Sequence, residues 1–283
     1  MNNSQITNGK ISALFSLRKL VEFADVCNAQ ISDRFWEELR LLQAAIYRLD
    51  AYYESHREIS NAHIMQCWVD INDAVSDLAE TSFVERFTLD IHAYERIEYS
   101  FRDSGCKDIL GLRHYYGLKT CDVRMSRHIL LTRQPSRNTL TPPSSWSDFD
   151  LIGEVLDDVI DVWQDIDNFN GNRFILGCIR DGVDVTIAQY RRFVVEVRDC
   201  LFLANNLGKG SAFALGASAA FEISEITLSE LARLDIASLG LSKAIAGCAL
   251  RSLLNQSHFS NNQDVRQHYR AASSSPRMYA GSN

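Results

Sequence analysis

Three aspartates spaced four residues apart form the pattern in this chain that is best suited to chemistry. Asp157, Asp161 and Asp165 stand at i, i+4 and i+8. Each step advances only about 40° beyond a full helical turn, so the spacing predicts three carboxylates along one stripe of a helix. The neighbouring Val155 and Val159 predict that this helix is seated on an apolar core.

Carboxylates stacked in this way repel one another by about 0.2–0.5 kcal/mol per pair unless a cation neutralises them. Mg2+ prefers carboxylate oxygens and completes its shell with water and substrate phosphates. The stripe therefore predicts a metal site that binds a diphosphate. The alternative, in a chain with 36 acidic residues, is a solvated acidic face.

The run Asp157-Asp158-x-x-Asp161-x-x-x-Asp165 resembles the second metal motif of the class I isoprenoid synthases. This superfamily includes trans-prenyl diphosphate synthases, squalene/phytoene synthases and class I terpene cyclases. Its cyclases carry Asn, Ser and Glu at the three positions, whereas the other members mostly carry Asp, as this chain does. Downstream, Asn170-Gly171-Asn172-Arg173 resembles the polar loop that follows this helix in the family, which implies that Arg173 binds substrate.

The resemblance implies a second acidic helix on the opposite wall of a cavity. Asp50 and Glu54, at i and i+4, resemble the first metal motif of the family, with Ala51 in place of its second acidic residue. Surface charge explains this pair almost equally well. The run Asp70-x-x-Asp73-x-x-x-Asp77 competes for the same role and ranks second, because it lies closer to the second motif than the family pattern usually allows.

An allylic diphosphate also needs cationic donors on its leaving group. Arg113 and Gly117 resemble the Arg and Gly that terpene cyclases place at a helix break upstream of the second motif. Lys119 and Thr120 resemble a Lys-Thr pair of the prenyl synthases. We expect Arg113, Gly117, Lys119 and Arg124 to act on the leaving group.

One further pair of residues is expected to complete the site. Tyr269 and Arg270 resemble, in inverted order, an Arg-Tyr pair that closes over the diphosphate in many cyclases. Arg127 is expected to be a solvated helix charge.

Composition excludes some classes of function. The net charge of −7 argues against a nucleic-acid surface, which needs clustered Lys and Arg. The seven cysteines lack the paired spacing of zinc sites and indicate a reducing compartment. The amino terminus lacks the pattern of a secretory signal, and no apolar run is long enough to span a membrane. We therefore expect a cytoplasmic protein.

Only four prolines interrupt long segments of helical periodicity. The pattern predicts an all-α, single-domain bundle of roughly ten helices, which the family resemblance places around a central cavity. We expect one domain over residues 1–270 and a disordered tail over 271–283. Helices are expected over residues 11–30, 32–57, 60–80, 82–102, 108–131 (with a break or kink at Gly111 or Gly117), 147–165, 185–206 and 208–225, with one or two more over 227–255.

The resemblance implies a class I terpene synthase that binds about two or three Mg2+ ions and ionises an allylic prenyl diphosphate. A prenyltransferase, either chain-elongating or of the squalene/phytoene synthase type, is the first alternative. A catalytically silent helical binding protein with the same fold is the second, supported by Ala51. Prenyl chain length, product skeleton and oligomeric state, including a homodimer, stay open.

Overall fold

The computed structural model describes residues 3–55, 60–76, 78–79, 81–104, 111–135, 142–168, 172–205 and 210–247. No strand occurs among these residues, so the prediction of an all-α protein is confirmed. In the part of the chain described, no helix is long and apolar enough to cross a membrane. The helices are α1 (Asn3–Leu17), α2 (Leu20–Val26), α3 (Asp33–Ser55), α4 (Asn61–Ser76), α5 (Thr81–Ser104), α6 (Leu112–Lys119), α7 (Cys121–Leu131), α8 (Ser144–Ile160), α9 (Val162–Asn168), α10 (Arg173–Asp181), α11 (Val183–Asn205) and α12 (Ser211–Ile236), with a further helical stretch at 238–247.

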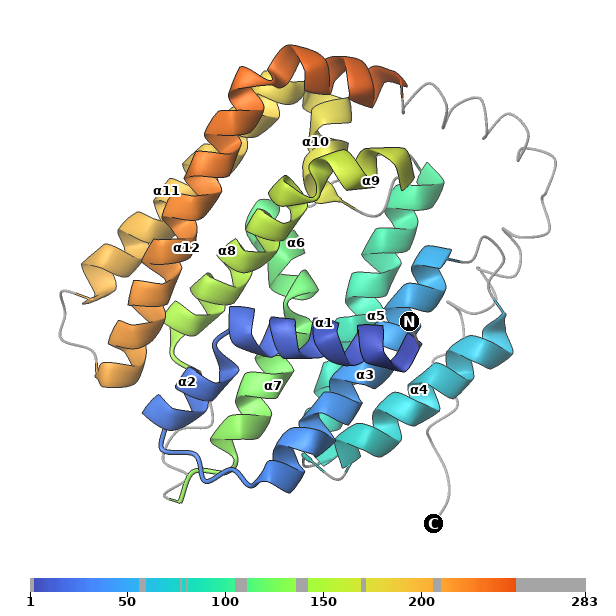
Figure 1. Cartoon of the computed structure of the whole chain (residues 1–283), viewed down its shortest axis with the longest axis vertical. Coiled ribbons are helices and arrows are strands. Elements are labelled where there is room, and N and C mark those ends of the chain that lie inside the picture. The colour runs from blue at the N-terminus through green and yellow to red at the C-terminus, as the bar shows by residue number, and fades with distance from the viewer. Residues whose placement is uncertain are drawn as a thin grey trace.

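The helices pack around one hydrophobic core to which nearly every helix contributes (Figure 1). α8, α11 and α12 pack against one another on one side of the bundle, whereas α3, α4 and α5 pack on the other. α8 and α12 approach closely because Gly216 has no side chain. A Cβ at Gly216 would lie 2.6 Å from Oγ of Ser145 and 2.9 Å from the Trp146 ring. The helix expected over residues 208–225 is therefore packed closely on α8, and it continues to Ile236.

The prediction of one helix over residues 11–30 is wrong, because the structure has two helices here, α1 and α2, which begin at Asn3 and end at Val26. Between them Lys19 adopts a left-handed backbone conformation with φ of 49°. Such a residue cannot continue a right-handed helix. The change of direction places the side chain of Arg18 inside the protein, where the residue is only 4% exposed.

The break expected at Gly111 or Gly117 is displaced. α6 begins directly after Gly111, but the break within the segment falls at Thr120, between α6 and α7. The hydroxyl of Thr120 donates to the carbonyl oxygen of Gly117 at 3.2 Å. Both helices are tied to α8 by an ion pair. Lys119 at the end of α6 and Arg127 in α7 each pair with an α8 carboxylate.

Candidate functional site

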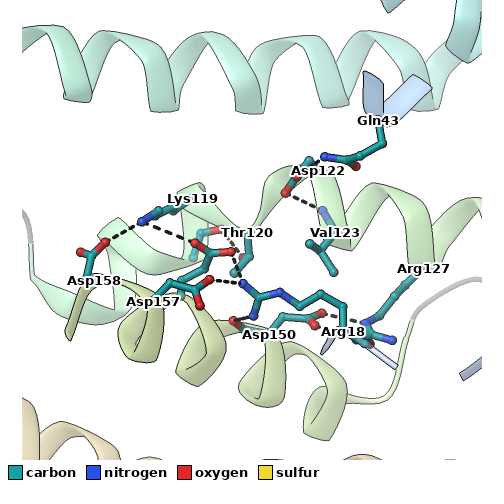
Figure 2. A network of polar contacts seen from close by, with 12 residues as sticks. Arg18, Gln43, Lys119, Thr120, Asp122, Val123, Arg127, Asp150, Asp157 and Asp158 are labelled. Carbon is teal, nitrogen blue, oxygen red and sulfur yellow. Dashed lines mark hydrogen bonds and ion pairs between the residues drawn. The ribbon is translucent and has the colours of Figure 1, made fainter. Parts of the chain in front are cut away.

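A network of charged side chains surrounds the carboxyl-terminal half of α8 (Figure 2). Arg18, from the α1–α2 break, lies at its centre. Nη1 of Arg18 donates to the carbonyl oxygen of Asp150 at 3.1 Å. Nη2 donates to Oε1 of Glu154 at 2.5 Å and to Oδ2 of Asp157 at 3.0 Å. One buried cation therefore bridges two carboxylates that are one helical turn apart.

Gly153 makes room for this cation. A Cβ at Gly153 would lie 1.7 Å from Nη1 of Arg18 and 2.8 Å from its Cζ. No atom pair can approach so closely, so any larger residue at position 153 forces the guanidinium to move. The glycine in the middle of α8 thus creates a notch that Arg18 fills.

Asp158, the next residue after Asp157, collects three donors. Its Oδ1 accepts from Nζ of Lys119 at 2.6 Å, and its Oδ2 accepts from the hydroxyl of Tyr116 at 2.7 Å and from the backbone N–H of Arg173 at 3.0 Å. Lys119 also lies 3.5 Å from Oε2 of Glu154. The break at Thr120 thereby brings Lys119 to Asp158 and Glu154, on either side of Asp157 in α8.

The protonation of this network follows from burial and charge. Burial lowers the pKa of Lys119, but the charges of Asp158 and Glu154 outweigh burial and hold this pKa well above its ordinary value. Burial and the charge of Asp158 raise the pKa of Tyr116, which also shares a 2.8 Å hydrogen bond with Tyr190. At neutral pH, Lys119 is therefore a cation and Tyr116 a neutral phenol.

The three aspartates of the stripe do not belong to one unbroken helix. α8 ends at Ile160 and α9 begins at Val162. The amide of Asp161 nevertheless donates to the carbonyl oxygen of Asp157, and the amide of Asp165 to that of Asp161, each at 2.9 Å. The helical turn thus continues through the kink, and the three residues remain in successive turns.

The environments of the three carboxylates differ. The Asp157 side chain is 52% exposed, Asp161 is exposed and Asp165 is half-buried. Partial burial and the neighbouring Glu154 raise the pKa of Asp157 from 3.8 to about 6, against the opposing charge of Arg18. Partial burial also raises the pKa of Asp165, although a hydrogen bond from Asn172 opposes the shift.

Asn172 ties the end of the stripe to α10. Its Oδ1 accepts from the amides of Phe174 and Ile175 and so caps α10. Its Nδ2 donates to Oδ2 of Asp165 at 2.9 Å and to the carbonyl oxygen of Asp158 at 2.7 Å. Arg173, which was expected to bind substrate, is 3% exposed and touches the network through its backbone N–H.

The opposite acidic wall is described only in part. Asp50 is exposed near the end of α3, and the side chain of Glu54 lies outside the described residues. Tyr47, one turn before Asp50, lies within electrostatic reach of Glu154: burial first, and then the charges of Asp122, Glu154 and Asp50, raise its pKa. In the competing run, Asp70 pairs with Arg48 at 3.2 Å, and Asp77 lies outside the described residues.

The structure separates the expected cationic residues. Lys119 pairs with Asp158, beside the first aspartate of the stripe, but Arg113 is exposed and pairs with Asp148 at 3.2 Å. Asp148 precedes Asp157 by nine residues, which is about 13 Å along a helix. Arg124 pairs with Asp90 on α5 at 3.4 Å. Tyr269 and Arg270 lie outside the described residues.

The prediction that Arg127 is a solvated charge is wrong. Arg127 is 1% exposed, and its Nε and Nη2 donate to the two oxygens of Asp150 at 2.7 and 2.6 Å. Its guanidinium also lies over the ring of Trp146, 4.5 Å from the centroid. Arg127 thus forms a buried, two-pronged ion pair that joins α7 to α8.

The exposed carboxylates of the stripe are ligands of the kind that Mg2+ prefers. Mg2+ is commonly held by one or two carboxylates together with substrate phosphates and water. Asp157 and Asp161 offer exposed carboxylate oxygens in successive turns, and Lys119 supplies positive charge beside them. Within the described part of the chain, however, no three acidic, His or Cys side chains converge closely enough to hold a metal by themselves. The arrangement fits a metal that a phosphorylated ligand helps to bind.

No protein-family model, curated protein or solved structure matches this chain. The likeness to class I isoprenoid synthases therefore depends on the motifs and on the contacts between them. The sequence reasoning missed Arg18, Glu154 and the role of Asp158. The one available signal was Gly153, a glycine inside an otherwise well-formed helix.

Proposed function

We propose that this chain is a Mg2+-dependent class I terpene synthase that ionises an allylic prenyl diphosphate. The observation that carries the proposal is the contact between Lys119 and Asp158, with Nζ and Oδ1 2.6 Å apart. It joins two motifs, far apart in the sequence, that both resemble diphosphate-binding motifs of the same superfamily. The all-α architecture is compatible with this proposal.

In the proposed reaction the allylic C–O bond breaks and its electron pair leaves with the diphosphate oxygen. Mg2+, when bound, would neutralise part of the charge on that diphosphate. Asp157, Asp161 and Asp165 would bind the metal, with Asp50 and Glu54 on the opposite wall. Such a cation would offset the repulsion among these carboxylates, to which Glu154 adds by raising the pKa of Asp157.

Lys119 would stabilise the departing diphosphate as negative charge develops on it. Its ammonium group stays charged at neutral pH because Asp158 and Glu154 hold its pKa high. Its side chain is about one-fifth exposed, so part of it remains accessible to a ligand. Arg113 and Arg124 belong to this proposal as longer-range cations, since each pairs with a carboxylate outside the stripe.

A product assay tests this function. The chain is incubated with farnesyl or geranylgeranyl diphosphate and Mg2+, with and without isopentenyl diphosphate, and the products are analysed by mass spectrometry. A terpene synthase forms hydrocarbons or alcohols of unchanged carbon number in both conditions. Products that lengthen only with isopentenyl diphosphate would instead establish a chain-elongating prenyltransferase, and a head-to-head product of doubled carbon number would establish a squalene-type enzyme.

One observation favours a catalytically silent helical protein instead. Glu154, Asp157 and Asp158 already have protein cations beside them, because Arg18 bridges the first two and Lys119 pairs with the third. A purely structural network needs no metal. Absence of any product in the assay above, with a folded chain, would favour this second candidate.

A further inference from the structure

Two buried N–H donors lie behind carboxylates of the aspartate stripe. Nη2 of Arg18 donates to Oδ2 of Asp157 at 3.0 Å, and Nδ2 of Asn172 donates to Oδ2 of Asp165 at 2.9 Å. Both donor residues are only 4% exposed, whereas the two carboxylates are exposed or half-buried. In each of these two hydrogen bonds, the donor therefore lies in the protein interior and the accepting carboxylate lies nearer to solvent.

The position of Arg18 is determined by more than its bond to Asp157. Its guanidinium also donates to the carbonyl oxygen of Asp150 and to Glu154, and it occupies the notch at Gly153. With these additional partners the guanidinium cannot follow a moving carboxylate outward. Arg18 therefore holds the carboxylate of Asp157 in place, whereas Asp157 does not determine the position of Arg18.

Asn172 is fixed in a comparable way. Its Oδ1 is committed to two amides at the start of α10, and its Nδ2 also donates to the carbonyl oxygen of Asp158. The amide plane cannot rotate without losing the helix cap. Asn172 therefore holds Oδ2 of Asp165 as Arg18 holds Oδ2 of Asp157.

We propose that Arg18 and Asn172 are positioning residues of the metal–diphosphate site, an inference that rests on the proposed function. Each holds one oxygen of a carboxylate from the inner side and leaves the other oxygen available to a cation. Oδ1 of Asp157 accepts no hydrogen bond within the described part of the chain. Partners of this kind contribute about 10- to 100-fold to metal affinity in characterised metal sites.

The test measures Mg2+ binding in the presence of inorganic diphosphate by isothermal titration calorimetry, on the full chain. Arg18→Gln is expected to weaken Mg2+ binding by about 10- to 100-fold. Arg127→Gln is the matched control, because Arg127 is equally buried and donates to the Asp150 carboxylate and to the backbone carbonyl oxygen of Arg18, but not to a carboxylate of the stripe. The control is expected to lower the thermal midpoint without changing the Mg2+ affinity.

Asn172→Ser is the second variant, and it keeps the inference testable if Arg18→Gln does not fold. Serine still caps a helix but is too short to reach Asp165. It is expected to weaken Mg2+ binding in the same direction. Unchanged Mg2+ affinity in either folded variant would overturn the positioning role. Equal losses of Mg2+ affinity in Arg18→Gln and Arg127→Gln would overturn it as well. In both cases, Mg2+ binding by the wild-type chain would leave the proposed function intact. Absence of joint Mg2+ and diphosphate binding by the wild-type chain would overturn both.

Discussion

Gly153 and Arg18 are complementary in shape: a Cβ on the glycine would lie 1.7 Å from Nη1 of the arginine. The two residues are far apart in the sequence, and the left-handed turn at Lys19 brings them together. Because Arg18 also bonds to Glu154 and Asp157, the fit at this notch determines the geometry of the network on α8.

We predict that Gly153→Ala lowers the free energy of unfolding by about 1–3 kcal/mol, since the added methyl group overpacks the notch and displaces the guanidinium. Gly117→Ala is the control, because a Cβ there meets nothing within 4 Å. In a helix this second change should raise the free energy of unfolding by up to about 1 kcal/mol. Urea titration measures both, and equal tolerance of the two alanines would show that Arg18 does not need the notch.

The ion pair between Arg127 and Asp150 supports a second prediction. Removing one charge by Arg127→Met leaves the fully buried carboxylate of Asp150 without its main cation, which should cost about 3–5 kcal/mol of unfolding free energy. The double variant Arg127→Met/Asp150→Leu should be more stable than this single variant, because no unpaired charge remains buried. A double variant whose loss equals or exceeds that of the single variant would contradict this account.

The raised pKa of Asp157 predicts that the free energy of unfolding depends on pH in metal-free buffer. Its pKa is raised from 3.8 to about 6, so between these values the folded chain binds more protons than the unfolded chain. The contribution of Asp157 to stability is therefore lost as the pH rises through about 6. Asp157→Asn should gain stability relative to the wild-type chain between pH 4 and pH 7, as measured by urea midpoints. A constant difference across this range would refute the raised pKa.

Helical periodicity predicted most of the fold, because apolar faces such as those of α3, α8 and α11 recur at the spacing of a helix. It could not predict the break before Lys19, since neither Arg18 nor Lys19 interrupts the pattern of apolar residues. A single left-handed residue there directs the side chain of Arg18 into the protein, to the centre of the network. The same limit applies to Arg127, whose burial depends on a partner from another helix.

The resemblance of two motifs to parts of one known site gave a reason to expect Lys119 near the second metal motif, and the structure pairs Lys119 with Asp158 of that motif. The positions of Arg113 and Arg124 were not accessible in this way. Each pairs with an acid on a neighbouring helix, Asp148 or Asp90, that no motif singled out. Which charges meet across helices depends on tertiary packing, which a pattern within one helix does not encode.

Release of inorganic diphosphate tests the central claim most directly. The assay supplies farnesyl or geranylgeranyl diphosphate to the wild-type chain and to Asp161→Asn, with Mg2+ or with a chelator. Asp161 is exposed and forms no ion pair within the described residues, so its substitution should change stability by less than about 0.5 kcal/mol. The account predicts release that requires Mg2+ and falls at least about tenfold in Asp161→Asn, as expected when a metal ligand is lost. Equal release with the chelator, or no release from a folded wild-type chain with either substrate, would contradict it.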